Sequence, residues 1–207
     1  MAKDKIIMVV KRELLFKGDY FQGFREANRI DYESRVLDNF QWMSRNEVEP
    51  NPDFKQPIAY TLIINPELKR AFAYQRSKQD SKYPEKRLQG KWSFGIGGHI
   101  EKPDIIGKNP IHSSMLRELQ EEVETQGKTI PVVLGYINDD KDSVGKVHFG
   151  ILYAAITNLE IIKPKDLEIA EGRLRSLSEI EKICSNPDFI VEGWSQIALE
   201  PLRKFLA

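Results

Sequence analysis

Three glutamates with helical spacing follow a glycine pair in the middle of the chain. Glu118, Glu121 and Glu122 lie in the segment "RELQEE", downstream of Gly97 and Gly98. On a helix, residues three or four apart are neighbours, so these carboxylates would lie within a few ångströms of one another. Clustered oxygen ligands favour Mg²⁺ or Mn²⁺, and proteins usually share magnesium between a few carboxylates and the phosphates of a substrate.

A solvated helix face is the alternative interpretation of the same glutamates. Acidic helix faces are common, and Arg117 dilutes the charge of this one. The residues before the helix favour the metal site, because a strand that ends in "GIGGH" permits close backbone approach. The carbonyl oxygen of Gly97 or Gly98 could then face a cation.

The segment around the glutamates carries the start and stop signals of a helix. Asn109 is a suitable N-cap, Pro110 suits the first helical position, and Gly127 suits the position after the last turn. We therefore predict a helix over residues 110–126. Its apolar arc is expected to consist of Met115, Leu116, Leu119 and Val123.

The order of strand, glycine turn, acidic loop and glutamate helix resembles the Nudix box. In one-letter code the box reads G-x5-E-x7-R-E-U-x-E-E-x-G-U, where U is aliphatic. "RELQEE", from Arg117 to Glu122, matches the second half in residue type and spacing, and Asp104 takes the place of the first glutamate after Gly98. The resemblance covers residues 57–207. The chain is also similar to phosphoesterase-like bacterial Nudix proteins that carry an N-terminal extension.

This chain departs from the Nudix box at two places. Twelve residues, 105–116, separate Asp104 from Arg117, where the box has seven. We expect this insertion to lengthen the loop before the helix and to leave the helix intact. The box glycine falls at Glu124, so the helix is expected to run on to Gly127.

The resemblance implies an α/β fold, the Nudix α/β/α sandwich with a mixed β-sheet. Residues 57–207 would form the Nudix domain, and residues 1–56 would form an α+β N-terminal extension packed on it. Three roles are open for this extension: it could cover the site, extend the sheet, or form the contact of a homodimer.

The resemblance also implies an enzyme, a Nudix-type pyrophosphohydrolase that cleaves a diphosphate linkage in a nucleoside diphosphate derivative or related phosphoanhydride. Attack of water on a diphosphate must overcome charge repulsion, and metal ions reduce it. Glu118, Glu121 and Glu122 would hold Mg²⁺ or Mn²⁺, and one of them would help to deprotonate the water. Arg117 would pair with Asp104 or with a box glutamate and orient it.

Further residues are candidates for substrate binding: Arg76, Trp92, Gly97, Gly98 and His99. Trp92 could stack on a base, although a tryptophan beside a strand more often belongs to the core. Arg76 could reach a phosphate, or it could be an exposed arginine at a loop edge. His99 adjoins the glycine pair, but His99, His112 and His148 are scattered and show no zinc-ligand spacing. Many Nudix enzymes take one more acid from outside the box, and the candidates are Glu168 and Glu171.

The remaining sequence predicts alternating strands and helices that would form a helix-covered sheet. Asp31 is the expected N-cap of a helix over residues 31–48, and the prolines of "EPNPDFKQP" mark the boundary near residue 56. The strands and later helices are predicted over residues 5–10, 58–66, 70–77, 91–100, 131–137, 146–157, 177–185 and 191–207, the pair 131–137 and 146–157 forming a hairpin.

Composition excludes several classes of partner. The 207 residues hold 31 lysines and arginines against 31 aspartates and glutamates, so the chain has no bulk attraction to nucleic acid or acidic membranes. No apolar run reaches the length of a membrane span, and the single cysteine, Cys184, asks for no oxidising compartment. We therefore expect a cytoplasmic protein with a small-molecule partner.

Two other functions stay open at this point. Isopentenyl-diphosphate isomerase, another branch of the superfamily, uses a cysteine in the strand before its glycine-histidine turn. Here that stretch is "WSFGIGGH" and Cys184 lies far downstream, which counts against an isomerase. A non-catalytic regulatory module would commonly lose box carboxylates, whereas this chain keeps Glu118, Glu121 and Glu122.

Overall fold

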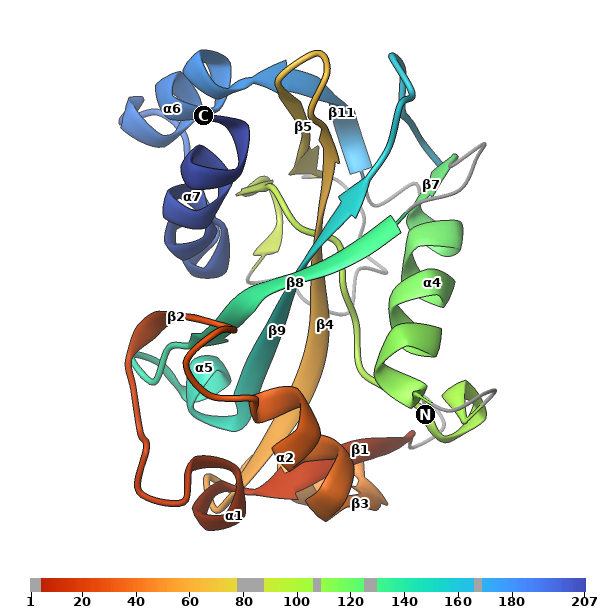
Figure 1. The fold of residues 1–207 in the computed structure, drawn as a ribbon, viewed down its shortest axis with the longest axis vertical. Helices are drawn as coiled ribbons and strands as arrows, with labels where there is room; N and C mark the ends of the chain where they lie inside the picture. Colours follow the sequence, from red (N-terminus) through yellow and green to blue (C-terminus); the bar gives the residue numbers. More distant parts are fainter. Residues whose placement is uncertain (1–4, 78–87, 106–108, 125–129, 166–168) are drawn as a thin grey trace. The chain divides into compact units, whose positions relative to one another are not determined.

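The computed structural model describes residues 5–77, 88–105, 109–124, 130–165 and 169–207 (Figure 1). The chain divides into two compact units. Unit 1 comprises Met1–Tyr60, Gly97–Arg117 and Val133–Tyr153, and unit 2 comprises Thr61–Ile96, Glu118–Val132 and Ala154–Ala207.

Unit 1 holds the N-terminal elements and the segments that flank the glycine turn. Its elements, some of which continue into unit 2, are β1 (Ile6–Lys11), α1 (Arg12–Phe16), β2 (Gly23–Glu26), α2 (Tyr32–Asn39), β3 (Phe40–Ser44), α3 (Arg45–Val48), β4 (Phe54–Asn65), the 3₁₀ turn η2 (Lys102–Asp104), α4 (Pro110–Glu122), β8 (Ile130–Asn138), α5 (Ser143–Val147) and β9 (His148–Ile156). The strands β4, β9, β8 and β2 are neighbours in that order, and β1 pairs with both β3 and β4.

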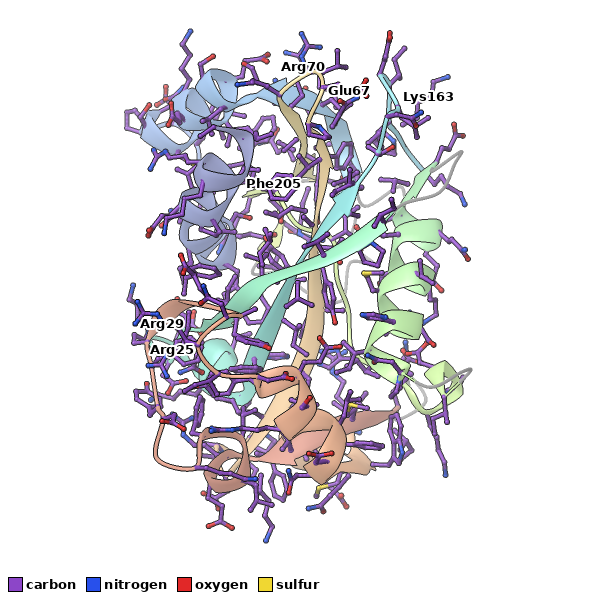
Figure 2. The ribbon with its side chains drawn as sticks, viewed as in Figure 1. Arg25, Arg29, Glu67, Arg70, Lys163 and Phe205 are labelled. Carbon is purple, nitrogen blue, oxygen red and sulfur yellow. The ribbon has the colours of Figure 1, made fainter. Side chains whose placement is uncertain are left out.

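The core of unit 1 combines apolar strands with an aromatic cluster, whose members are Phe16, Phe21, Tyr32, Tyr136 and Phe149. Arg25 of β2 (Figure 2) lies 4.7 Å from the centre of the Phe21 ring and donates a 2.8 Å hydrogen bond to the hydroxyl of Tyr32. A buried cation, Lys55, begins the buried run of β4 and donates to a carboxylate oxygen of Asp140 at 2.7 Å. Burial lowers the pKa of Lys55 to about 8, against the pull of Asp140.

Unit 2 holds the C-terminal half of β4 and the elements that pair with it or follow it. They are β5 (Arg70–Arg76), β6 (Trp92–Ser93), β7 (Val123–Glu124), β10 (Lys163–Pro164), β11 (Ile169–Ser176), α6 (Leu177–Ser185) and α7 (Gly193–Leu206). The strand order here is β11, β5, β4, with β6 on β5, and β10 pairs separately with β7. Figure 1 shows α6 and α7 side by side, as their contacts require.

The predicted fold class is confirmed as a mixed α/β architecture with a large mixed sheet. β11 runs antiparallel to β5, whereas Trp92 and Val191 form a parallel bridge. The boundary predicted near residue 56 stays a prediction. Within the described ranges, no helix combines the length and the apolar composition that a membrane crossing needs.

The helix predicted over residues 31–48 is wrong in its second half. Asp31 does cap α2, since its carboxylate accepts from the Ser34 amide at 2.9 Å. The chain then turns into β3, because β1 offers an antiparallel partner in register from Val10 with Phe40 to Ile6 with Ser44. Sheet pairing overrides the helical spacing of this segment.

The helix that carries the glutamates is shorter than predicted. α4 ends at Glu122, and Val123 and Glu124 form β7 by pairing with β10. Gly127, the predicted cap, lies outside the described residues. Leu116 was placed on the apolar arc, but it is 44% exposed, because the buried stripe runs through Ile111, Met115 and Leu119 at intervals of one turn.

Two strand predictions also need correction. β6 covers only Trp92 and Ser93, and the rest of that predicted strand contributes isolated bridges at Ile96 and His99. The predicted hairpin exists as β8 and β9, but its connection contains α5. Gly145 of α5 is required there, since a Cβ at this position would overlap the carbonyl oxygen of Asp139.

Candidate functional site

The glutamates of α4 differ in burial. Glu118 and Glu122 lie one turn apart, in line with Ser114 one turn earlier, and we call these two glutamates the acidic row. Ser114 is fully buried, Glu118 and Glu122 are half-buried, and Glu121 is exposed. The row therefore runs beside the buried stripe of α4 and does not occupy its most solvated side. This placement argues against a purely solvated acidic face.

The start of α4 is fixed by a side-chain cap. Asn109 accepts hydrogen bonds from the amides of Ile111 at 2.9 Å and His112 at 3.2 Å. Its own amide nitrogen donates to Glu33 of α2 at 2.8 Å, so a residue of the N-terminal segment positions the cap. The insertion before the helix ends at this cap, and the prediction that it leaves the helix intact is confirmed.

Arg117 forms an ion pair with Asp104, one of the two kinds of partner that the sequence allowed, the other being a box glutamate. The Nε of Arg117 donates to Asp104 at 2.8 Å, and its Nη2 donates to the other carboxylate oxygen at 3.1 Å. Asp104 is only 5% exposed and also accepts from the amide of Glu101 at 2.7 Å. The same Nη2 donates to the carbonyl of His99 at 3.0 Å. Arg117 thus ties α4 to the glycine turn, a fork geometry that lysine cannot reproduce.

The glycine turn lies against the backbone of β4. His99 forms a bridge with Ile58, and a Cβ added to Gly97 would stand 2.5 Å from the carbonyl oxygen of Ala59. Gly97 is therefore required for close packing within unit 1. Its predicted role in substrate binding, with that of Gly98, stays a prediction.

His99 is the predicted substrate-binding residue with the richest surroundings. Its Nε2 lies 2.7 Å from Oε1 of Gln56 and 3.2 Å from Nε2 of His148. Burial and the nearby His148 lower the pKa of His99 well below its ordinary value. Sequence spacing missed this neighbourhood, because the three residues come from separate elements and no local pattern links them.

The other predicted binding residues, Arg76 and Trp92, lie in unit 2 and are engaged there. Arg76 donates to Glu192 at 2.6 Å, and both side chains are mostly buried. Trp92 is 3% exposed, with the guanidinium carbon of Arg175 4.8 Å from its ring centre. Burial of Trp92 favours the core interpretation that the sequence left open.

Of the two acids predicted to complete the site from outside the box, the structure describes only Glu171. Glu171 lies on β11 and accepts from Arg175 at 3.5 Å, with a half-exposed side chain. Glu168 lies outside the described residues. Cys184 of α6 is half-buried, and burial raises the pKa of its thiol, as expected for a packing residue.

The donor set of α4 has the chemistry that a hard divalent cation prefers, but among the described residues Glu118, Glu121 and Glu122 do not bring their ligand atoms within 4.8 Å of one another. All of its candidate ligands are carboxylate oxygens, and the helix that carries them is fixed by the Asn109 cap and by the Arg117–Asp104 pair. Mg²⁺ and Mn²⁺ prefer such oxygen ligands and complete their coordination with water and substrate phosphates.

Solved structures define the class of protein. The crystal structure of Tm1382, a protein assigned to the Nudix hydrolases, matches with a TM-score of 0.73 at 27% identity and covers 97% of this chain and 99% of its own. The NUDIX domain of NrtR from Shewanella oneidensis, solved with ADP ribose, matches at a TM-score of 0.55 and 14% identity over 74% of this chain and 89% of its own. This chain belongs to the Nudix hydrolase superfamily, and the superfamily that the sequence predicted is confirmed.

A full-length relative gives the narrower placement. Protein YmaB of Bacillus subtilis strain 168 is 33% identical over 212 residues, which span 97% of this chain and 98% of YmaB. The chain belongs to the same family as YmaB, and the shared length includes the N-terminal segment. No family model matches the chain.

Proposed function

We propose that the chain hydrolyses a diphosphate linkage in a nucleoside diphosphate derivative or related phosphoanhydride, with Mg²⁺ or Mn²⁺. The observation that carries this proposal is the half-buried acidic row of α4. The helix is held in place by the Asn109 cap and by the ion pair of Arg117 with Asp104. A cation bound there would neutralise phosphate oxygens and lower the pKa of a bound water.

The roles of the residues follow from their positions. Glu118, Glu121 and Glu122 hold the cation, and Arg117 holds α4 against the turn through Asp104. Asp104 is a positioning residue, because both of its oxygens accept from protein groups. The ADP ribose in the NrtR complex supports the choice of a nucleotide-linked diphosphate as substrate class.

The alternatives find less support. An isomerase of the isopentenyl-diphosphate type would need a reactive thiol, whereas Cys184 lies in α6 with a raised pKa. A non-catalytic module would have no reason to keep three glutamates on a fixed helix. The homodimer and the cytoplasmic location stay predictions, and a sedimentation measurement would decide the first.

A substrate panel tests the proposed function. Metal-free protein would be incubated with nucleotide sugars including ADP ribose, dinucleoside polyphosphates and nucleoside triphosphates, with and without Mg²⁺. We expect cleavage of at least one compound, only when Mg²⁺ or Mn²⁺ is present. Full activity in a verified metal-free sample would rule out the metal requirement.

A matched pair of variants tests the acidic row. Glu122→Gln keeps the size and helix propensity of the side chain, and we expect kcat/KM to fall about a thousandfold, which corresponds to about 4 kcal/mol. Glu124→Gln removes the same charge from an exposed position on β7 and should leave turnover within a few-fold of the parent protein. Equal turnover in both variants would show that the row is not the catalytic metal site.

A further inference from the structure

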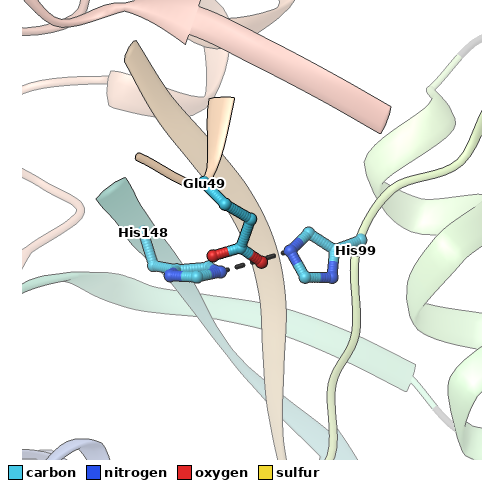
Figure 3. A group of neighbouring side chains, drawn as sticks. All are labelled: Glu49, His99 and His148. Carbon is cyan, nitrogen blue, oxygen red and sulfur yellow. Dashed lines mark hydrogen bonds between the residues drawn. The ribbon is translucent and has the colours of Figure 1, made fainter. Parts of the chain in front are cut away.

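A second set of ligand side chains lies entirely within unit 1. Among the described residues, one group of three has its donor atoms within 4.8 Å of one another: Glu49, His99 and His148 (Figure 3). We call it the histidine cluster. Figure 3 shows the two rings and the carboxylate turned toward one another. No residue of α4 belongs to it.

Hydrogen bonding within the histidine cluster leaves too many acceptors for the protons available. Nδ1 of His148 lies 2.7 Å from the carbonyl of Val144, so this nitrogen carries the proton and Nε2 presents a lone pair when the ring is neutral. That lone pair and the Oε1 of Gln56 both face Nε2 of His99, and a carboxylate oxygen of Glu49 lies within 4.8 Å of the ligand atoms of both rings. A single N–H on His99 can satisfy only one of them.

The buried amide of Gln56 brings another oxygen to the histidine cluster, since its Oε1 lies beside Nε2 of His99. Gln56 is fully buried, and its Nε2 has no hydrogen-bond partner. Turning the amide over would place its nitrogen against His99 and leave the oxygen unpaired instead. The unpaired atom of Gln56 is a donor, which a cation does not satisfy, and the atom that faces the cluster is the oxygen Oε1.

We propose that Glu49, His99 and His148 form a binding site for Zn²⁺ or a similar divalent transition metal, distinct from the carboxylates of α4. The separation of the two imidazole nitrogens, 3.2 Å, is close to the edge of a zinc tetrahedron, about 3.3–3.4 Å for bonds of 2.0–2.1 Å. Two imidazoles and one carboxylate are the ligand set of zinc sites that keep a fourth position open. Neutral imidazoles are the form that binds metal, and burial lowers the pKa of both rings.

The supporting contacts are those of a prepared site. The Val144 carbonyl fixes the ring of His148, and Lys55 donates to the backbone carbonyl of the same residue at 3.0 Å. Arg45 donates to one carboxylate oxygen of Glu49 at 2.8 Å, which orients that side chain. Partners of this kind orient ligands in metal sites and are usually needed for tight binding.

The elements that supply the ligands indicate what the ion would do. Glu49 is the C-cap of α3 in the N-terminal segment, His99 belongs to the glycine turn, and His148 is the first residue of β9. A bound ion would therefore crosslink the N-terminal segment to the turn that opens the Nudix box. This gives residues 1–56 a structural role within unit 1.

Metal titrations with variants test the proposal. Metal-free protein would be titrated with Co²⁺, read by its visible absorption, and with Zn²⁺ against a chromophoric chelator, with the melting temperature as a second readout. We expect one equivalent of Zn²⁺ to bind and the melting temperature to rise with Zn²⁺ concentration. Substituting a ligand, in His148→Ala or Glu49→Gln, should lower affinity by more than about a hundredfold, since changing outer partners alone costs about 10- to 100-fold.

Two controls separate this site from surface histidines and from the acidic row. His112→Ala removes a histidine that packs against Tyr153 outside the cluster, and Glu122→Gln alters the acidic row, so both should keep the zinc affinity of the parent protein. If His148→Ala does not fold, Glu49→Gln decides, because that side chain is one-third exposed. A folded parent protein that binds no Zn²⁺, or unchanged affinity in Glu49→Gln, would overturn the proposal.

Discussion

The acidic row of α4 and the histidine cluster place their ligand side chains by opposite routes. The glutamates come from one helical segment, so the pitch of the helix alone puts them on neighbouring positions. The histidine cluster joins the end of α3, the glycine turn and the start of β9, which meet only when unit 1 is folded. The first site can be read from spacing, whereas the second requires the tertiary structure.

The two regions also differ in donor chemistry. The acidic row offers only carboxylate oxygens, which suit Mg²⁺ or Mn²⁺, whereas the histidine cluster offers two imidazole nitrogens and one carboxylate, which suit Zn²⁺. We therefore expect Mg²⁺ or Mn²⁺ to bind at the acidic row and Zn²⁺ to bind at the histidine cluster. The chain connects them at His99, whose ring belongs to the cluster and whose carbonyl accepts from Arg117.

The largest expected effect is a crossed result between two variants. Glu118→Gln should lower kcat/KM with Mg²⁺ by about a thousandfold, and it should leave Zn²⁺ affinity unchanged. His148→Ala should lower Zn²⁺ affinity by more than about a hundredfold while the protein keeps its Mg²⁺ requirement. Both variants would be measured in both assays. If one substitution damages both functions equally, the comparison between two separate sites fails.

The sequence was most informative where structure is local. The Asn109 cap, the start of α4 and the pairing of Arg117 with a box carboxylate follow from residue types within a short segment, and the structure confirms them. The end of α4 was wrong, because β10 offers Val123 and Glu124 a strand partner that is remote in sequence. β3 was missed for the same reason. Its partner β1 lies about thirty residues earlier in the chain, too far for the short turn signals that predict a hairpin.

The histidine cluster shows the same limit for function. His99 was selected for its place beside the glycine pair, but Glu49 and Gln56 carried no signal in the sequence. His148 looked like a strand residue of undetermined direction. Burial and hydrogen-bond accounting, which need coordinates, are what distinguish these side chains from ordinary polar residues.

The second prediction concerns which side of α4 faces inward. Leu119 is 2% exposed and Leu116 is 44% exposed. Leu119→Ala should lower the free energy of unfolding by about 2–5 kcal/mol, whereas Leu116→Ala should cost much less. Denaturant unfolding of both variants measures the difference. Equal losses would mean that the buried stripe includes Leu116, and the acidic row would then lie on the solvated side.

The third prediction concerns the tie between α4 and the glycine turn. Arg117→Lys keeps the charge but loses the fork to Asp104 and the hydrogen bond to the His99 carbonyl, so we expect a loss of about 1–3 kcal/mol in the free energy of unfolding. The control is Arg203→Lys, which alters an exposed pair with Glu181 and should cost less than about 1 kcal/mol. A smaller loss for Arg117→Lys than for the control would show that the fork does not fix the helix.

The smallest expected effect lies at the start of α4, where the N-terminal segment meets the helix through Glu33. Asn109→Ala removes the cap and should lower the free energy of unfolding by about 0.5–2 kcal/mol. Asn109→Ser restores a capping oxygen but not the amide that donates to Glu33, so it separates the two contacts. We expect the serine variant to recover most of the loss, because the cap satisfies two backbone donors that have no partner within the helix. Chemical denaturation of the three proteins, with Zn²⁺ affinity measured alongside, would decide. Equal losses for alanine and serine would instead assign the stabilisation to the Glu33 contact, and the N-terminal segment would then support both regions of the comparison.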